Sequence, residues 1–342
     1  MRCAYRASTL YINPEIITES VTVIDTLNMI LRMIIPDMEA VCKNLHNCRP
    51  KTFRDGLNGY EGYLKSWHNT KNHDLKVQIT NYYVKVGFAS WGKWFYGDNF
   101  RTMTLNDIRQ CLDRISEILG LPMGEAQITR LDIGHNIIVD HKPEIYLNHL
   151  GTILHHKRLP TSEGSLYYSN SLRQFVLYDK KKAPRHKRDI VPEEYINSHV
   201  LRLELRLLRK SASNFNTKFI TADMLCTEAF YHACISIWEQ YYWKIQKIND
   251  MGGDIGSIKT KTSLYNYAIG FLAEQFGGQM QLIEFFEESQ AKKVITSKQK
   301  SDLKEAVINA CNSPILSQPS ELITELDRKV NEATEFLRRR CF

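Results

Sequence analysis

The chain has 342 residues, of which 43% are hydrophobic and 24% are charged, and this composition is typical of a folded protein with one large domain or two ordinary ones. The net charge of +7 comes from 45 basic and 38 acidic residues and only weakly favours a polyanionic partner. The sequence contains no Pro/Gly-rich or low-complexity tract, so its composition does not predict a long disordered region.

The eight cysteines are scattered and form no CxxC pair, which argues against a zinc ribbon and against a dense disulfide framework. We therefore expect reduced thiols and a place in the cytoplasm of a bacterial host cell. The apolar stretch from Leu27 to Pro36 is too short to span a bilayer, which needs about 20 apolar residues, and acidic residues precede it. The sequence thus predicts neither a signal peptide nor a membrane anchor.

Strand and helix patterns alternate through the first two thirds of the chain. The segment from Lys76 to Ala89 is rich in β-branched and aromatic residues and predicts strands. From Thr104 to Leu121, apolar residues recur at intervals of three and four behind a capping threonine, which predicts one amphipathic helix. Three further strand segments run from Ile128 to Val139, from Ser165 to Lys180 with a hairpin turn near Asn170, and from His199 to Arg209.

After Ser211 the pattern changes to helices, from Thr221 to Ile248 and from Ser301 to Phe342. We therefore expect an α+β fold with a central, mostly antiparallel sheet that carries the active site, helices that flank it, and a helical C-terminal region. The expected domains are residues 1–210 and a mainly helical region of residues 211–342.

Two strands place an acid or a phenol beside a cation, because side chains two residues apart lie on one face of a strand. Arg130 and Asp132 share a face, so Asp132 either pairs with the arginine or binds a divalent metal. Tyr178 and Lys180 share a face of the next strand, where the lysine would favour an ionised nucleophile. A tyrosine in a strand more often only packs, so both interpretations of Tyr178 stay open.

In the third strand the leucines at 201, 203, 205 and 207 point one way and Arg202, Glu204 and Arg206 point the other. Glu204 is then either a paired acid or a second metal ligand whose neighbouring arginines hold DNA phosphates. We expect the charged residues of the three strands to share one face of the sheet.

A basic run begins directly after Tyr178. Such runs are commonly solvated loops, but beside a scissile phosphate this one would supply the salt-dependent part of DNA affinity. The run consists of Lys180, Lys181, Lys182, Arg185, His186, Lys187 and Arg188.

Four blocks of the sequence resemble, in order and spacing, the replication initiators of filamentous phages, the gene-two proteins. The similarity to the rolling-circle initiators of staphylococcal plasmids is looser. The blocks are the G-x-N-F turn at Gly97 to Phe100, Arg130-x-Asp132, the hairpin from Glu163 to Lys180, and Leu201-Arg202-x-Glu204-x-Arg206, which together cover roughly residues 76 to 210. The His-hydrophobic-His pair of the broader nicking superfamily is absent from this sequence, which favours a carboxylate metal site.

The resemblance implies that Tyr178 is the catalytic nucleophile, assisted by Lys180, and that Asp132 and Glu204 bind Mg²⁺ or Mn²⁺. Glu163 is a third candidate for the metal site. It also implies that Arg130, Arg202, Arg206 and the basic run (Lys181, Lys182, Arg185, Lys187, Arg188) contact DNA.

The function that the resemblance implies is a rolling-circle replication initiator. Such a protein is an origin-specific, metal-dependent single-strand DNA endonuclease and strand transferase, which forms a 5′-phosphotyrosyl intermediate and a free 3′-OH primer. Residues 1–210 would bind and nick DNA, and residues 211–342 would recognise the origin, oligomerise or act as an accessory region. Its partners would be a phage or plasmid origin, single-stranded or cruciform at the nick, host helicase and polymerase, and a second copy in a homodimer, with no membrane.

Two alternatives stay open from the sequence. A mobilisation relaxase or a transposase would perform the same chemistry on a different DNA. A non-catalytic nucleic-acid-binding module would only hold phosphates on its basic face. Binding alone should survive a chelator and Tyr178→Phe, whereas nicking should not.

Overall fold

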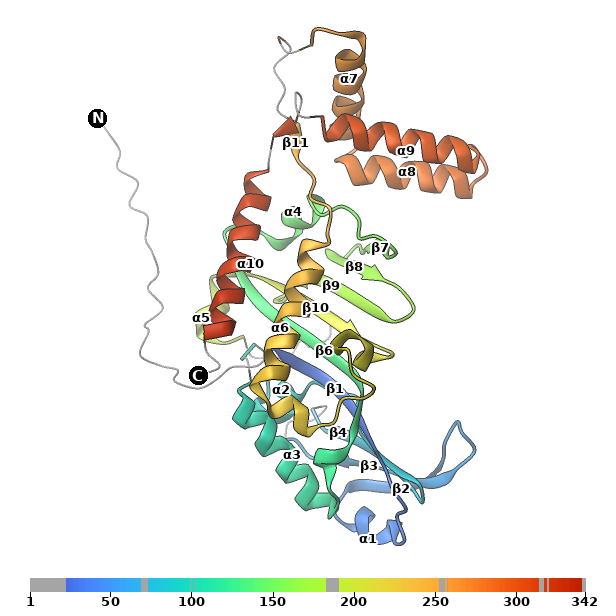
Figure 1. The fold of residues 1–342 in the computed structure, drawn as a ribbon, viewed down its shortest axis with the longest axis vertical. Coiled ribbons are helices and arrows are strands. Elements are labelled where there is room, and N and C mark those ends of the chain that lie inside the picture. Colours follow the sequence, from blue (N-terminus) through green and yellow to red (C-terminus); the bar gives the residue numbers. More distant parts are fainter. Residues whose placement is uncertain are drawn as a thin grey trace, which may run out of the picture.

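The computed structural model is an α+β protein with an antiparallel sheet and a helical C-terminal region, which confirms the predicted fold class. It describes residues 23–68, 73–98, 100–101, 103–182, 191–251, 256, 258–313, 317–318 and 320–339. The main sheet has ten strands in the order β2-β3-β4-β5-β1-β6-β10-β9-β8-β7 (Figure 1). These strands are Ile24–Arg32 (β1), His46–Thr52 (β2), Asn58–Leu64 (β3), Leu75–Thr80 (β4), Tyr83–Gly87 (β5), Gln127–Val139 (β6), Lys157–Pro160 (β7), Ser165–Ser169 (β8), Arg173–Asp179 (β9) and His199–Leu207 (β10).

In the described part of the chain, helices α1 to α5 lie between strands of the main sheet, and α6 to α10 come after its last strand. They are Met38–Lys43 (α1), Trp91–Tyr96 (α2), Leu105–Leu119 (α3), Pro143–Asn148 (α4), Glu193–Ile196 (α5), Glu228–Trp243 (α6), Lys261–Gln275 (α7), Gln279–Ala291 (α8), Ser297–Cys311 (α9) and Glu321–Arg339 (α10). A short pair of strands, Asp250–Met251 (β11) and Ser317–Gln318 (β12), joins the segments that lead into α7 and out of α9.

Helix α3 forms where its capping pattern predicts it. The Thr104 hydroxyl accepts a hydrogen bond from the Asp107 backbone N–H at 3.0 Å, and the Asp107 carboxylate accepts one from the Thr104 N–H at 2.7 Å. These bonds satisfy two backbone donors that the first turn of a helix otherwise leaves free. The helix ends at Gly120, which adopts a left-handed φ of 65°.

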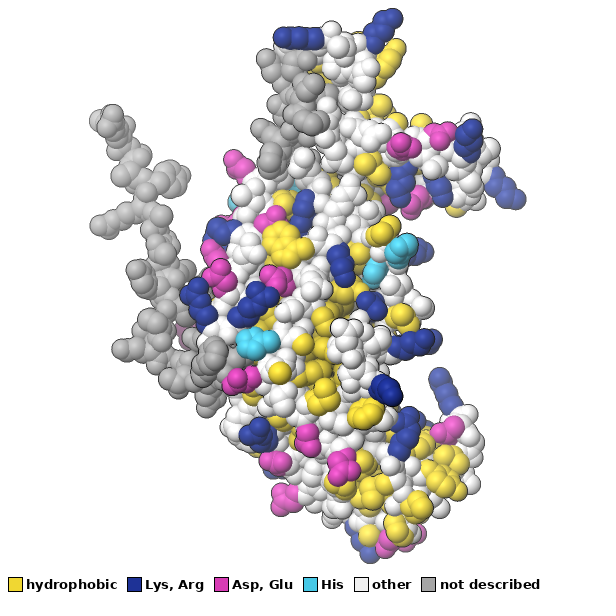
Figure 2. Space-filling view, viewed as in Figure 1, with side chains coloured by type: hydrophobic (Ala, Val, Ile, Leu, Met, Phe, Trp, Pro, Cys, Tyr) yellow, Lys and Arg dark blue, Asp and Glu magenta, His cyan; other side chains and the backbone are white. Residues whose placement is uncertain are grey.

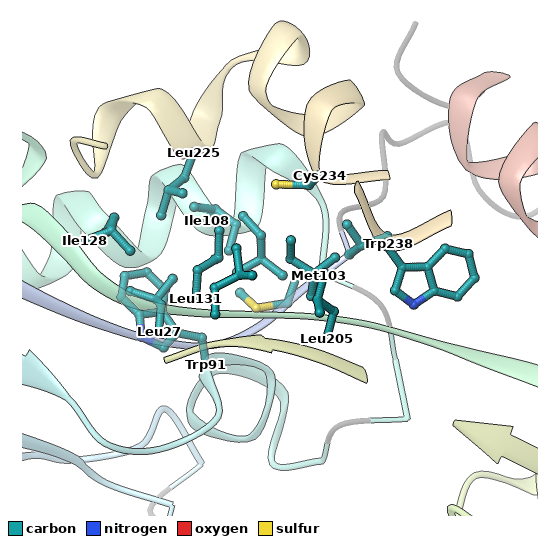
Figure 3. Packing of buried hydrophobic residues seen from close by; sticks show 14 of the residues in the cluster. Leu27, Trp91, Met103, Ile108, Ile128, Leu131, Leu205, Leu225, Cys234 and Trp238 are labelled. Carbon is teal, nitrogen blue, oxygen red and sulfur yellow. The ribbon is translucent and has the colours of Figure 1, made fainter. Parts of the chain in front are cut away.

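The hydrophobic core lies between one face of the sheet and helices α3, α6 and α10. Figure 3 shows Leu27, Leu131 and Leu205, from β1, β6 and β10, packed with Ile108 of α3. Trp238 of α6 is fully buried and donates its indole N–H to the backbone carbonyl of β10. Burial of one such leucine contributes about 1.5–3 kcal/mol. Since α6 and α10 complete this core, the core continues beyond the domain boundary predicted at residue 210.

Helices α7, α8 and α9 pack around a second, smaller hydrophobic cluster that includes Met280, Leu282 and Val307. Figure 1 shows these three helices projecting from one end of the sheet. Arg158 of β7 donates a hydrogen bond to Glu284 of α8 at 2.8 Å, which is one contact between the two bodies.

The expectation of eight reduced thiols is wrong for two cysteines. Cys42 of α1 and Cys48 of β2 form a disulfide, because the chain reverses direction between these elements and brings their Cα atoms to 5.9 Å. Cys111, Cys226, Cys234 and Cys311 are free. None of the helices in the described part of the chain has the length and apolarity needed to cross a membrane.

Candidate active site

The register of three neighbouring strands brings the predicted site residues to one face of the sheet. Arg202 of β10 lies opposite Tyr178 of β9, and Arg206 lies opposite Asp132 of β6. Because side chains alternate along a strand, these residues and Glu204 share the face opposite the core. We call this the polar face of the sheet.

Glu204 is surrounded by hydrogen-bond donors on this face. Its carboxylate accepts from Arg206 Nε at 2.6 Å, from Arg202 Nε at 3.2 Å and from the Tyr178 hydroxyl at 3.0 Å. Burial by itself would raise the pKa of Glu204, but the two guanidinium groups outweigh burial and hold the pKa well below its usual range. Glu204 is therefore an ionised carboxylate that accepts the phenolic proton of Tyr178 in a hydrogen bond.

Asp132 forms the ion pair that was one of its two interpretations from sequence. Its two oxygens accept from Arg130 Nε at 2.9 Å and from Arg130 Nη2 at 2.6 Å. The residue is only 1% exposed, and this burial raises its pKa to about 6 in spite of the arginine. The negative charges of Glu204 and Asp25 act in the same direction as burial, so an added cation would relieve this repulsion.

The structure adds Asp25 to the cluster, a residue that the sequence did not indicate. Its carboxylate accepts from Arg202 Nη2 at 2.7 Å and from the Ser90 hydroxyl at 2.6 Å. Arg202 Nη1 also donates to the Asn136 side chain at 3.0 Å. The buried guanidinium of Arg202 thus links β1, β6 and β10.

Gly134 makes room for this guanidinium. A Cβ atom at position 134 would lie 2.8 Å from Arg202 Nη2, a separation that forces one of the two groups to move. Glycine at this point of β6 therefore allows the arginine to cross the strand.

The protein's own groups favour a neutral Tyr178 rather than the phenolate that we expected. Burial raises the pKa of Tyr178, and the charge of Glu204 raises it further. Lys180 does not offset this, because burial and the nearby Arg202 lower its own pKa to about 7. Its Nζ lies 5.2 Å from the centre of the Phe100 ring. At neutral pH the lysine is thus near the midpoint of its titration, and the phenol is protonated.

Three of the other predicted site residues, Glu163, Lys181 and Lys182, lie apart from the cluster. Glu163 is exposed in the turn before β8 and is not among the buried carboxylates. Lys181 Nζ donates to the carbonyls of Ile196 and Ser198, and Lys182 pairs with Glu144. Arg185, His186, Lys187 and Arg188 fall outside the described residues.

The G-x-N-F turn reaches the polar face, although Asn99 lies outside the described residues. Gly97 ends α2 with a left-handed φ of 84°. Asp98 accepts a hydrogen bond from the Phe100 N–H at 2.9 Å, and the Phe100 carbonyl accepts one from Asn136 at 3.1 Å. The turn therefore borders the cluster.

The chemistry of the donor set fits Mg²⁺ or Mn²⁺, which prefer carboxylate oxygens. Asp25, Asp132 and Glu204 lie on one face, and their mutual repulsion adds to the burial that raises the pKa of Asp132. Each carboxylate is bonded to an arginine, and within the described ranges no three His, Cys, Asp or Glu side chains are arranged to hold a metal. A bound cation would have to compete with these arginine contacts.

The family of phage replication-associated proteins of the gene-two type, described by its N-terminal region, matches residues 23–228, more than half of the chain. The chain belongs to this family. The match includes β1, β6, β9 and β10 and therefore all the strands that carry the cluster. Membership gives this family member a role in the initiation of replication, which implies DNA binding. No curated protein matches the chain.

Proposed function

We propose that this family member is a rolling-circle replication initiator that nicks one DNA strand at a phage or plasmid origin with Tyr178. The observation that carries the proposal is the phenol of Tyr178, which donates to the ionised Glu204 within a buried cluster of arginines and carboxylates. In attack on a phosphodiester, the phenol would be the nucleophile, the carboxylate would orient it through the hydrogen bond, and the nearby cations would stabilise the negative charge that develops on the phosphate.

In the proposed reaction the Tyr178 oxygen attacks phosphorus, and its proton leaves to solvent by way of the existing hydrogen bond to Glu204, whose low pKa keeps the carboxylate from retaining it. The bond between phosphorus and the 3′ oxygen breaks as the new bond to tyrosine forms. Lys180 gives a proton to the departing 3′ oxygen, a task that suits its pKa of about 7. The products are a 5′-phosphotyrosyl link and a free 3′-OH, which primes a host polymerase once a helicase opens the duplex. Later attack by a 3′-OH on the link transfers the strand.

Mg²⁺ or Mn²⁺ is part of the proposal, with Asp132 and Glu204 as the residues that would hold it. When bound, the ion would stabilise the charge that develops on the phosphate oxygens. Glu163 is the weaker candidate ligand because it is exposed and lies outside the cluster.

Two of the arginines expected to bind DNA, Arg202 and Arg206, are internal counter-ions in this structure. Arg202 is buried against Asp25 and Glu204, and Arg206 also pairs with Glu204. Of the three, Arg130, whose side chain is one third exposed, remains accessible while it is paired. The phosphate contacts must therefore come largely from other cations.

Such cations lie on β2 and β4. Lys76 alternates with the buried Val77, so it lies on the polar face. Lys51 and Lys76 approach Glu61 at 2.6 and 3.6 Å, and Arg49 approaches it at 3.8 Å. Three cations around one carboxylate leave a positive excess, so we propose that this half of the sheet holds the DNA backbone.

Changing both lysines to glutamine should remove about one to two phosphate contacts. The slope of the logarithm of the DNA-binding constant against the logarithm of salt concentration should become correspondingly shallower, and an unchanged slope would refute this role.

Incubation with supercoiled DNA that carries the element's own origin tests the proposal as a whole. Wild-type protein with Mg²⁺ or Mn²⁺ should yield open circles whose 5′ ends are linked to protein, and EDTA should abolish both products. Binding of manganese, followed by its electron paramagnetic resonance, tests the metal separately from activity and should weaken in Asp132→Asn. Origin binding that survives EDTA without any nicking would leave only the binding-module function.

The pH dependence of nicking tests the role of Lys180. The ratio kcat/KM reports the free protein, so it should fall as the pH rises through about 7, because the neutral amine has no proton to give. Below this pH the lysine is charged and the ratio should not depend on it. In Lys180→Arg the guanidinium stays charged but does not give up a proton, so nicking should be slower and this fall should disappear. A wild-type profile without a fall between about pH 6 and 9 would contradict the assignment.

A further inference from the structure

Helix α7 is apolar on two opposite sides. Gly270 and Ala273 are buried on the side that faces the smaller cluster of α8 and α9. The other side exposes large hydrophobic residues, namely Leu264 (50% exposed), Tyr265 (63%), Phe271 (54%) and Leu272 (45%). Figure 2 shows hydrophobic side chains at the surface along this helix. A helix that is hydrophobic all round is normally buried all round, and an exposed apolar patch marks an interaction site.

The exposed side has an approximate two-fold symmetry that a second copy of the same helix would match. At about 100° per residue, the four large residues form a stripe centred on Ala268, which is also exposed. Leu264 and Leu272 lie four residues before and after Ala268, and Tyr265 and Phe271 lie three before and after it. The stripe thus presents the same pattern of side chains when the helix is reversed about Ala268.

We propose that α7 binds the α7 of a second copy of this chain, antiparallel, with the two-fold axis at Ala268. In this arrangement Leu264 faces Leu272 of the second copy, and Tyr265 faces its Phe271. The small side chain of Ala268 lets the helices approach closely where they cross. Such an interface is isologous, since each copy offers the same patch.

Charge supports the antiparallel direction over the parallel one. Lys261 lies seven residues before Ala268 and Gln275 lies seven after it. The antiparallel pair therefore sets Lys261 against the amide of Gln275, whereas a parallel pair would set it against the same lysine of the second copy. Like charges placed opposite each other cost binding energy and select against that pairing.

Molar mass in solution tests the interface. Wild-type protein should approach twice the monomer mass as its concentration rises, in sedimentation equilibrium or light scattering. Leu264→Glu with Phe271→Glu should stay monomeric at every concentration, with an unchanged circular dichroism spectrum. Phe219→Glu is the matched control, because Phe219 is 51% exposed outside α7, and this variant should dimerise as the wild type does. A wild type that stays monomeric, or a folded double variant that still dimerises, would overturn the proposal.

Cysteine cross-linking tests the register. Ala268→Cys should form a disulfide-linked dimer above the level that the native cysteines give in the wild type. Leu264→Cys alone should not, but a mixture of Leu264→Cys and Leu272→Cys should. If the Leu264→Cys variant alone forms as much disulfide-linked dimer as Ala268→Cys does, the helices pair in parallel. That result would overturn the antiparallel arrangement.

Discussion

Tyr178→Phe should reduce origin nicking and the linkage of protein to 5′ ends to background, a loss of at least about 10³-fold. The reason is that phenylalanine keeps the ring but has no oxygen to attack phosphorus. Glu204 keeps its two arginine partners in the variant, so the loss of one hydrogen bond should cost only about 1 kcal/mol of stability. The measurement is the yield of open circles and of labelled 5′ ends attached to protein.

Tyr167→Phe is the matched control for this variant. Tyr167 of β8 lies opposite Val176 of β9 and is on the polar face, on the strand next to Tyr178. It should nick at close to the wild-type rate. If Tyr178→Phe nicks and links as well as Tyr167→Phe does, another residue is the nucleophile. If both variants and the wild type bind DNA but never nick, the enzymatic proposal itself fails.

Arg202→Leu should have the largest effect on stability, lowering the free energy of unfolding by about 3–5 kcal/mol. The arginine is 4% exposed and bonds to Asp25, Glu204 and Asn136, so its removal leaves two buried carboxylates without their shared counter-ion. Chemical denaturation, with the midpoint and slope compared between variants, measures the loss.

An exposed pair provides the control for the loss of a charge. Arg328 and Glu332 on α10 form a 2.7 Å pair in which both side chains are more than half exposed. Arg328→Leu should therefore change stability by no more than about 0.5 kcal/mol. Asp25→Asn and Glu204→Gln, added to Arg202→Leu, remove the two charges that are left without a counter-ion. The triple variant should therefore recover part of the lost free energy of unfolding. Equal effects of Arg202→Leu and Arg328→Leu would show that the cluster is not desolvated as described.

The parts of the fold that the sequence predicted depend on local patterns. The leucines of β10 alternate with charged residues, and α3 has its cap and its apolar spacing within a few turns. Strand β2 has no such pattern, since its seven residues, HNCRPKT, are mostly exposed at the edge of the sheet. Its position follows from pairing with β3, which a local pattern does not contain.

The same distinction applies to the candidate site. The two-residue period assigned Asp132, Tyr178 and Glu204 to one face of their own strands, and the register of the three strands brings these faces together. Asp25 could not be assigned in this way, because it meets Arg202 across 177 positions of sequence. The alternation of side chains along a strand predicts on which face an arginine lies, but it does not predict which group the arginine binds. Arg202 and Arg206 are expected as phosphate ligands from sequence, and only their ion pairs with the buried Glu204 show them to be internal counter-ions.

The position of β10 has a consequence for synthesis of the protein on the ribosome. This strand lies between β6 and β9 in the sheet, yet it is the last of the ten to be translated. Until it emerges, Asp25 lacks Arg202, Tyr178 lacks Glu204, and Asp132 has only Arg130 of its own strand beside it. A nascent chain that stalls before β10 would therefore carry the proposed nucleophile without its partners, and the proposed cleavage would wait for the completed sheet.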